Sequence, residues 1–273
     1  MQLTSRFKIR QIKSIIKFLN ENNVGRISTI DTEGFPQIIP MNFVCAPDFS
    51  GNFNLNNGDG GDDDNCKTVA AAASTAAAAS GQKEELEGEG GKKGGEQGLR
   101  NGKAFAGSPI IYMHSHHRGE KLDNLKRNPK VGFEADREVC FLPSYYFHPT
   151  DASFADTLYI SVVIKGKASI VTDNREKAFA MNAMMQKYQV EGGYTPLTEG
   201  MKSIQHLTVL KINPESITGK YKIGQEWTAR YRSNIARKII EREGMARAKE
   251  VLEQMKIKIL ADGELEVTDP VAM

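Results

Sequence analysis

The feature that most constrains the fold of this chain is a long internal stretch that cannot build a packed core. Between residues 50 and 107 the sequence is dominated by Gly, Asn, Asp, Ala and Glu, and large apolar side chains almost vanish. Such a stretch cannot bury enough apolar surface to offset the conformational entropy that is lost on ordering. We therefore predict a disordered, low-complexity insertion at residues 50–107, which divides one folded domain into residues 1–49 and 108–227.

The roughly 215 residues outside the insertion are enough for one compact domain. They include runs typical of strands, such as GRISTID, PIIYMHS and TLYISVVIKGKASIV, with a turn or bulge expected near Gly166. Pro40 interrupts another run, FPQIIPMNFVCAP, and predicts an edge strand or a bulge. Strands outnumber helices and follow at hairpin-like spacing, so the predicted fold class is mainly β with flanking helices, an antiparallel sheet or barrel. Residues 228–273 are expected to form one long amphipathic helix, over 228–255, and a tail.

Composition and charge argue against several classes of protein. No apolar stretch approaches the about 20 residues that cross a bilayer, and the N-terminus lacks a signal-peptide core, so we expect a cytoplasmic protein with no membrane partner. The net charge of +2 gives no overall attraction to nucleic acid, although residues 220–258 carry a surplus of Lys and Arg. The cysteines Cys45, Cys66 and Cys140 are far apart and form no C-x-x-C pair, which argues against a disulfide framework or a thiolate zinc site.

Three of the five histidines cluster in IYMHSHHRGEKLDNLKRNPKV, residues 111–131. His114 and His116 would share one face of a strand and could hold a metal ion, but no third ligand follows at a defined spacing. A histidine could also act as a general acid or base, but no nucleophile accompanies it, so no catalytic residue is named. His148 and His206 are isolated in the sequence, as is typical of structural histidines.

The same segment has the features of an anion site. A strand ends near Ser115, a polar turn follows, and a helix begins near Arg118 to Lys121. The first N–H groups of a helix lack intrahelical partners and carry partial positive charge, which suits a phosphate. Ser115 could donate its hydroxyl, while Arg118 and Lys121 would supply charge. The alternative is a plain strand-to-helix turn with exposed basic side chains.

Several motifs, taken in order, resemble one known family. GRISTID, EGFPQIIPMNFV, IYMHSHH and GEKLDNLKRNPKVGF are followed by VVIKGKASIVTDNREKAFAMNAMMQKY and LTVLKINPESITGK. This series resembles the FMN-binding split-barrel superfamily, whose best-known members are the pyridoxamine 5'-phosphate oxidases. The closer resemblance is to the flavin-nucleotide-binding branch that includes the 5-nitroimidazole-resistance proteins. It covers most of residues 8–224 outside the insertion.

The resemblance implies an antiparallel six-stranded split β-barrel, a homodimer, and FMN bound in two equivalent clefts at the subunit interface. It places Lys121 at the FMN phosphate, with Ser115 and His116 on the same turn. His114 matches a histidine at the end of a strand near the cofactor.

The first two strands add further candidates through the same resemblance. PMNF, which ends in Asn42 and Phe43, matches the strand that passes along the flavin ring, where Asn42 would hydrogen-bond the polar edge of the ring. Arg26 on the first strand is a candidate for the phosphate or the subunit interface. The true oxidases carry an Arg and a Lys on the second strand, and this chain has Ile39 and Val44 near those places; their C-terminal substrate-binding Arg-x-His is also absent. Vitamin B6 oxidation is therefore not the activity we expect.

The expected function is that of an FMN-binding oxidoreductase acting on a small organic substrate through the flavin. Two alternatives stay open. A haem-binding split barrel would use His114 or His206 as an axial ligand. A non-catalytic flavin sensor would use the basic C-terminal helix to dock a partner.

Overall fold

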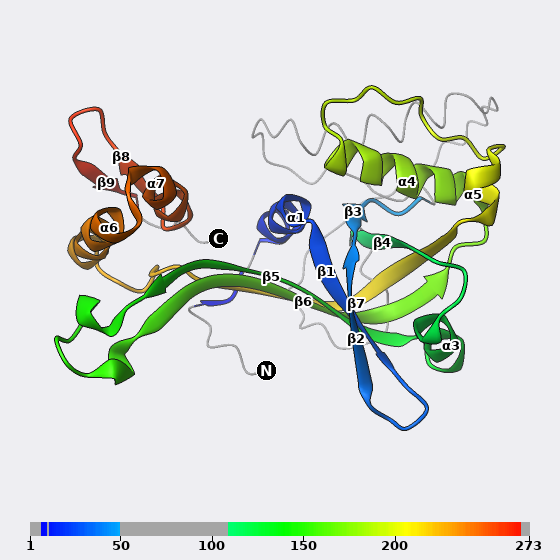
Figure 1. Cartoon of the computed structure of the whole chain (residues 1–273), viewed down its shortest axis with the longest axis horizontal. Coiled ribbons are helices and arrows are strands. Elements are labelled where there is room, and N and C mark those ends of the chain that lie inside the picture. Colours follow the sequence, from blue (N-terminus) through cyan, green and yellow to red (C-terminus); the bar gives the residue numbers. More distant parts are fainter. Residues whose placement is uncertain (1–6, 10, 50–108, 269–273) are drawn as a thin grey trace, which may run out of the picture. The chain divides into compact units, whose positions relative to one another are not determined.

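The computed structural model of the chain describes residues 7–9, 11–49 and 109–268 (Figure 1). The predicted disordered insertion at residues 50–107 therefore lies outside the described residues. Within the described ranges, no helix is both long enough and apolar enough to span a membrane.

The described strands form one seven-stranded sheet in the order β2-β1-β5-β6-β7-β4-β3, and a separate small hairpin. β4 pairs antiparallel with both β7 and β3. The fold is mainly antiparallel β with flanking helices, as predicted from the sequence. The strands of the sheet are β1 (Val24–Ile30), β2 (Pro36–Asn42), β3 (Val44–Ala46), β4 (Ile110–Ser115), β5 (Lys130–Leu142), β6 (Asp156–Ile170) and β7 (Thr208–Lys222).

Seven strands replace the expected six because the second predicted strand is interrupted, at Phe43 rather than at Pro40. Pro40 lies inside β2, which is an edge strand, as a proline in a strand predicts. β2 and β3 lie at opposite ends of the strand order, yet only Phe43 separates them along the chain. The sheet therefore has to curl until its two edges approach, and β2 indeed contacts β4 without pairing with it. Hydrogen bonds among the described strands do not close the sheet.

The chain divides into two compact units. Unit 1 comprises Met1–Arg26, Phe133–Ile164 and Ile217–Met273, and unit 2 comprises Ile27–Gly132 and Lys165–Ser216. Unit 2 contains residues from every strand of the seven-stranded sheet, whereas unit 1 contains parts of β1, β5, β6 and β7 only.

One apolar core of unit 2 lies between helix α4 (Asn174–Tyr188) and strands β3 and β4 (Figure 1). The buried face of the helix is supplied by apolar residues at helical spacing, which meet buried residues of the strands. This cluster consists of Val44, Ala46, Ile110, Tyr112, Val171, Phe179, Ala180, Ala183, Met184 and Val209.

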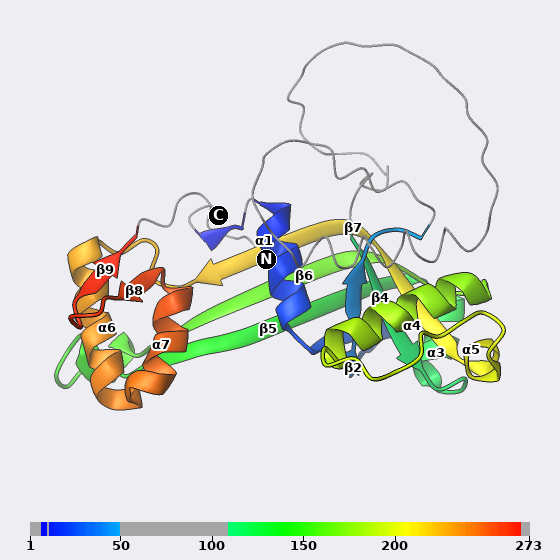
Figure 2. The same cartoon turned by 90° about the horizontal axis from the view of Figure 1, so that it is seen from above.

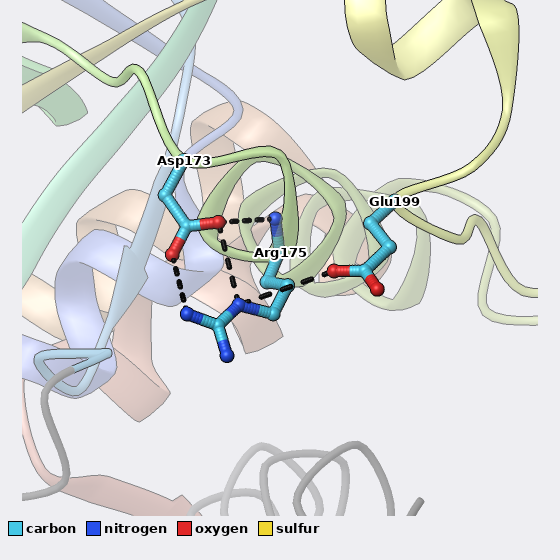
Figure 3. A network of polar contacts seen from close by, with 3 residues as sticks. All are labelled: Asp173, Arg175 and Glu199. Atoms are coloured by element: carbon cyan, nitrogen blue, oxygen red, sulfur yellow. Dashed lines mark hydrogen bonds and ion pairs between the residues drawn. The ribbon is translucent and has the colours of Figure 1, made fainter. Parts of the chain in front are cut away.

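Figure 3 shows how α4 begins. The Asp173 carboxylate accepts a hydrogen bond from the Arg175 N–H at 2.8 Å and pairs with its guanidinium at 3.2 Å. Glu199, which precedes α5 (Lys202–His206), reaches the same guanidinium at 3.9 Å. Glu176, three residues after Asp173, turns inward, and its carboxylate accepts from the Tyr112 hydroxyl at 2.7 Å.

Strand β6 runs without a break through Gly166, where the sequence predicts a turn or bulge. Gly166 instead allows the backbones of β6 and β7 to approach each other closely. A Cβ atom at this position would lie 2.3 Å from the carbonyl oxygen of Asn213 on β7. The two backbones approach too closely here for any side chain.

Unit 1 ends in two helices and a hairpin in place of the single long helix that was expected. α6 (Ala229–Glu243) and α7 (Met245–Gln254) are separated by Gly244, whose φ of 76° and ψ of 158° form a backbone conformation that essentially only glycine adopts. Figures 1 and 2 both show these helices beside β8 (Ile257–Ile259) and β9 (Leu265–Val267). Near the N-terminus, α1 (Ile12–Glu21) buries an apolar face of its own.

Phe43, the single residue between β2 and β3, is fully buried and held by the last turn of α4. Its N–H donates to the Tyr188 hydroxyl at 3.0 Å, and its carbonyl accepts from Tyr188 at 3.1 Å and from Lys187 Nζ at 3.0 Å. The Lys187 ammonium also lies 3.8 Å from the centroid of the Phe43 ring, a cation–π contact. Burial lowers the pKa of Lys187 to about 8.

This lowered pKa predicts a pH-dependent contribution of Lys187 to stability. Between pH 8 and the ordinary lysine value of 10.5, the unfolded chain binds a proton that the folded chain has released, so folding becomes more favourable as the pH rises. The free energy of unfolding of the natural chain should therefore rise, relative to that of Lys187→Met, by at most about 3 kcal/mol across this window. Urea unfolding at several pH values measures the difference, with Lys126→Met as the control for loss of one lysine. A difference that does not change with pH would contradict the assignment.

Candidate functional site

The predicted anion site begins where β4 ends. Ser115, the last residue of β4, is buried, and its hydroxyl donates to the His116 carbonyl at 2.9 Å. The His116 ring accepts a hydrogen bond at Nδ1 from the Arg118 N–H at 3.2 Å. These two side chains therefore shape the turn that leads to helix α3 (Glu120–Arg127). His114 lies in β4 opposite Val209, with its side chain exposed.

Lys121 folds back over the start of α3. Gly119 is the N-cap residue, with a φ of 142° that L side chains rarely adopt. A Cβ atom at Gly119 would lie 3.9 Å from Lys121 Nζ, which places the ammonium beside the N-cap. No carboxylate within the described ranges forms an ion pair with this ammonium. Its positive charge is therefore available to a ligand.

Hydrogen bonds between side chains hold α3 against β1 and β2. Asn124 is buried, and its Nδ2 donates to Thr29 Oγ1 at 3.1 Å and to Gln37 Oε1 at 3.3 Å. Its Oδ1 accepts from Arg127 Nη2 at 2.9 Å, and the same nitrogen lies 2.8 Å from the Ile30 carbonyl, to which it also donates. Because these bonds are directional, they fix the position of α3 on the two strands.

Both carboxylates of the first turn of α3 have partners other than Lys121. Glu120 accepts a hydrogen bond from Gln37 Nε2. Asp123 forms an ion pair with Lys126 at 3.0 Å. Both carboxylates near the start of α3 therefore have other partners. Without these partners, each would be attracted to the Lys121 ammonium and to the first N–H groups of the helix.

The donor set of this turn fits a phosphate group. The Lys121 ammonium, which forms no ion pair with the described part of the chain, lies beside a helix N-cap. The first N–H groups of a helix carry partial positive charge, and the exposed Arg118 adds a second cation. A flavin nucleotide would be held at its phosphate by Lys121 and these N–H groups. Of the predicted residues, Ser115, His116 and Lys121 lie on this segment, between the end of β4 and the first turn of α3.

Asn42, Phe43 and Arg26 have different surroundings. Asn42 ends β2 with an exposed side chain, whereas the Phe43 ring is fully buried beside α4. Arg26 belongs to unit 1, where its guanidinium pairs with Asp136 and, at 2.9 Å, with Glu134. Hydrogen bonds to Asp136 and Glu134 raise the pKa of Arg26.

The histidines do not assemble into a metal centre in the part of the chain that the structure describes. No three His, Cys, Asp or Glu side chains within residues 7–9, 11–49 and 109–268 are placed to hold an ion. The exposed rings of His116 and His117 lie with their centroids 4.1 Å apart. His206 is the last residue of α5, and β7 starts two residues later, at Thr208.

Sequence reasoning missed the residues that position α3. Thr29 and Gln37 reach Asn124 across 95 and 87 positions of the chain. No spacing rule for helices or strands relates residues so far apart. An amide inside the otherwise amphipathic helix LDNLKR was the one local signal, because a buried polar side chain requires partners.

Comparisons with known proteins bear on the same region. The sequence model of a family described as pyridoxamine 5'-phosphate oxidase matches residues 100–221, fewer than half of the 273. This range contains the whole turn between β4 and α3 and most of β7. No curated protein matches the chain.

Several solved structures align with the chain at low similarity. A candidate 5-nitroimidazole antibiotic resistance protein from Bacteroides thetaiotaomicron VPI-5482 is 17% identical, with 78% of this chain and 85% of that chain covered and a TM-score of 0.46. The flavocytochrome Anf3 from Azotobacter vinelandii is 12% identical, with 81% and 72% covered and a TM-score of 0.48. The FAD and haem binding protein from Mycobacterium smegmatis is 9% identical, with 79% and 73% covered and a TM-score of 0.46.

These scores are too low to carry an argument about function. The family match, in contrast, includes the turn between β4 and α3, where the sequence motifs and the position of Lys121 both indicate an anion site. It confirms that this chain resembles the pyridoxamine 5'-phosphate oxidase family, and it does so over residues 100–221.

Proposed function

We propose that the chain binds FMN and acts as an oxidoreductase on a small organic substrate. The observation that carries this proposal is the Lys121 ammonium beside the N-cap of α3, within the range matched by the oxidase family. A dianionic phosphate would gain a charge-assisted hydrogen bond from Lys121 together with contacts to helix N–H groups.

The remaining residues of the turn would bind and orient the cofactor. The Ser115 hydroxyl bond and the His116 ring maintain the backbone path to Gly119, and Asn42 offers an exposed amide at the end of β2. His114 would stand near the ring system from β4. FMN, when bound, supplies hydride or electron transfer, while the protein supplies position and electrostatics.

We also propose that the chain forms a homodimer with the flavin sites at the interface, as the family resemblance implies. In support, large apolar side chains are exposed at the edge strand β2: Phe35, the residue before the strand, is 64% exposed, and Ile38 within it is 61% exposed. A subunit interface would bury such exposed apolar side chains.

Loss of the Lys121 ammonium should weaken FMN binding. We predict that Lys121→Ala raises the Kd for FMN by about tenfold or more, since a charge-assisted hydrogen bond contributes about 1.5–3 kcal/mol. Lys126→Ala removes a lysine from the same helix, one that is paired with Asp123, and should leave the Kd unchanged. Quenching of flavin fluorescence on titration measures both values.

A protein that takes up no FMN would overturn the proposed function. If haem titration then produced a Soret band, the haem-binding alternative would replace it.

The dimer has its own test. Sedimentation velocity should show the natural chain as a dimer and Ile38→Lys as a monomer, because a charge placed in an apolar interface is costly to desolvate. A natural chain that sediments as a monomer at micromolar concentration would contradict the dimer.

A further inference from the structure

Gln37 on β2 bridges two positions of α3 that lie one helical turn apart. Its Nε2 donates to the carboxylate of Glu120, and its Oε1 accepts from Asn124 Nδ2 at 3.3 Å. Glu120 is the first residue of α3 and the sequence neighbour of Lys121. One amide side chain therefore engages the acidic group closest in sequence to the proposed phosphate site.

The position of the Glu120 carboxylate matters electrostatically. A carboxylate at the first position of a helix is attracted to the unpaired N–H groups of the first turn, and the nearby ammonium adds to this attraction. These are the groups that the proposed phosphate site uses. A freely rotating Glu120 would therefore compete with a bound phosphate and repel it.

We propose that Gln37 is a positioning residue that keeps the Glu120 carboxylate on the β2 side of α3, so that Lys121 and the helix N–H groups remain open to the phosphate. This inference rests on the proposed function, because it concerns the same anion site. Gln37 would act through Glu120 and does not itself contact the ligand.

A simpler alternative is that Gln37 only anchors α3 through Asn124. Thr29 offers a matched comparison, because it is fully buried on β1 and accepts from the same Asn124 amide at 3.1 Å, whereas the hydrogen bond to Glu120 comes from Gln37. Thr29→Val removes one hydrogen bond to Asn124 of α3 and leaves the hydrogen bond between Gln37 and the Glu120 carboxylate intact. Gln37→Met removes one hydrogen bond to Asn124 and also removes the hydrogen bond to the Glu120 carboxylate.

The test is a set of FMN titrations at low and high ionic strength on the full chain. Gln37→Met should raise the Kd by about five- to tenfold at low salt and by less at high salt, because the added repulsion is between partly exposed charges. Glu120→Gln should bind FMN at least as tightly as the natural chain. The double variant Gln37→Met/Glu120→Gln should have the same Kd as Glu120→Gln. In contrast, adding Glu120→Gln to Thr29→Val should not restore any FMN affinity that Thr29→Val has lost.

Two outcomes would overturn this inference alone. The first is an unchanged Kd in Gln37→Met while Lys121→Ala weakens binding. The second is a loss in Gln37→Met that Glu120→Gln does not restore, which would assign the effect to helix anchoring. Absence of FMN binding by the natural chain would overturn the proposed function and, with it, this inference.

Discussion

The short connection at Phe43 is the constraint on which the site depends. One residue joins β2 and β3, which lie at opposite ends of the strand order, so the sheet has to curl. The last turn of α4 secures that joint through Tyr188 and Lys187. Curling also brings β2 against β4, and α3 follows β4 in the chain. A side chain of β2 can consequently reach α3, and this is the contact that Gln37 makes.

Attachment of α3 combines two kinds of interaction with different roles. Leu122 and Leu125 are buried and supply apolar adhesion, which is strong but not directional. Asn124, buried between them, adds hydrogen bonds that define where the helix lies on β1 and β2. Precise placement matters for an anion site, since the Lys121 ammonium and the helix N–H groups act together only if the helix start is fixed.

The sequence predicts the main features of the fold and of the turn between β4 and α3, but not the tertiary contacts that fix the position of α3. Alternating apolar runs, Pro40 and the Gly119–Lys121 turn follow from local periodicity and backbone chemistry, and the motif order indicates the family. The interruption between β2 and β3 at Phe43 depends on tertiary packing. The break between α6 and α7 depends on the backbone conformation of Gly244 alone, and the helical periodicity over 228–255 does not reveal it. The partners of Asn124 come from strands far away in the sequence, so only the folded chain identifies them.

Comparison of FMN with riboflavin tests most directly whether the turn between β4 and α3 binds the phosphate of a flavin nucleotide. The two ligands share the ring system and the ribityl chain and differ only in the phosphate. Equilibrium titration of the natural chain should give a Kd for FMN at least about tenfold below that for riboflavin, and the difference should shrink with added salt. Equal affinity for the two ligands would contradict the assignment of this turn as a phosphate site.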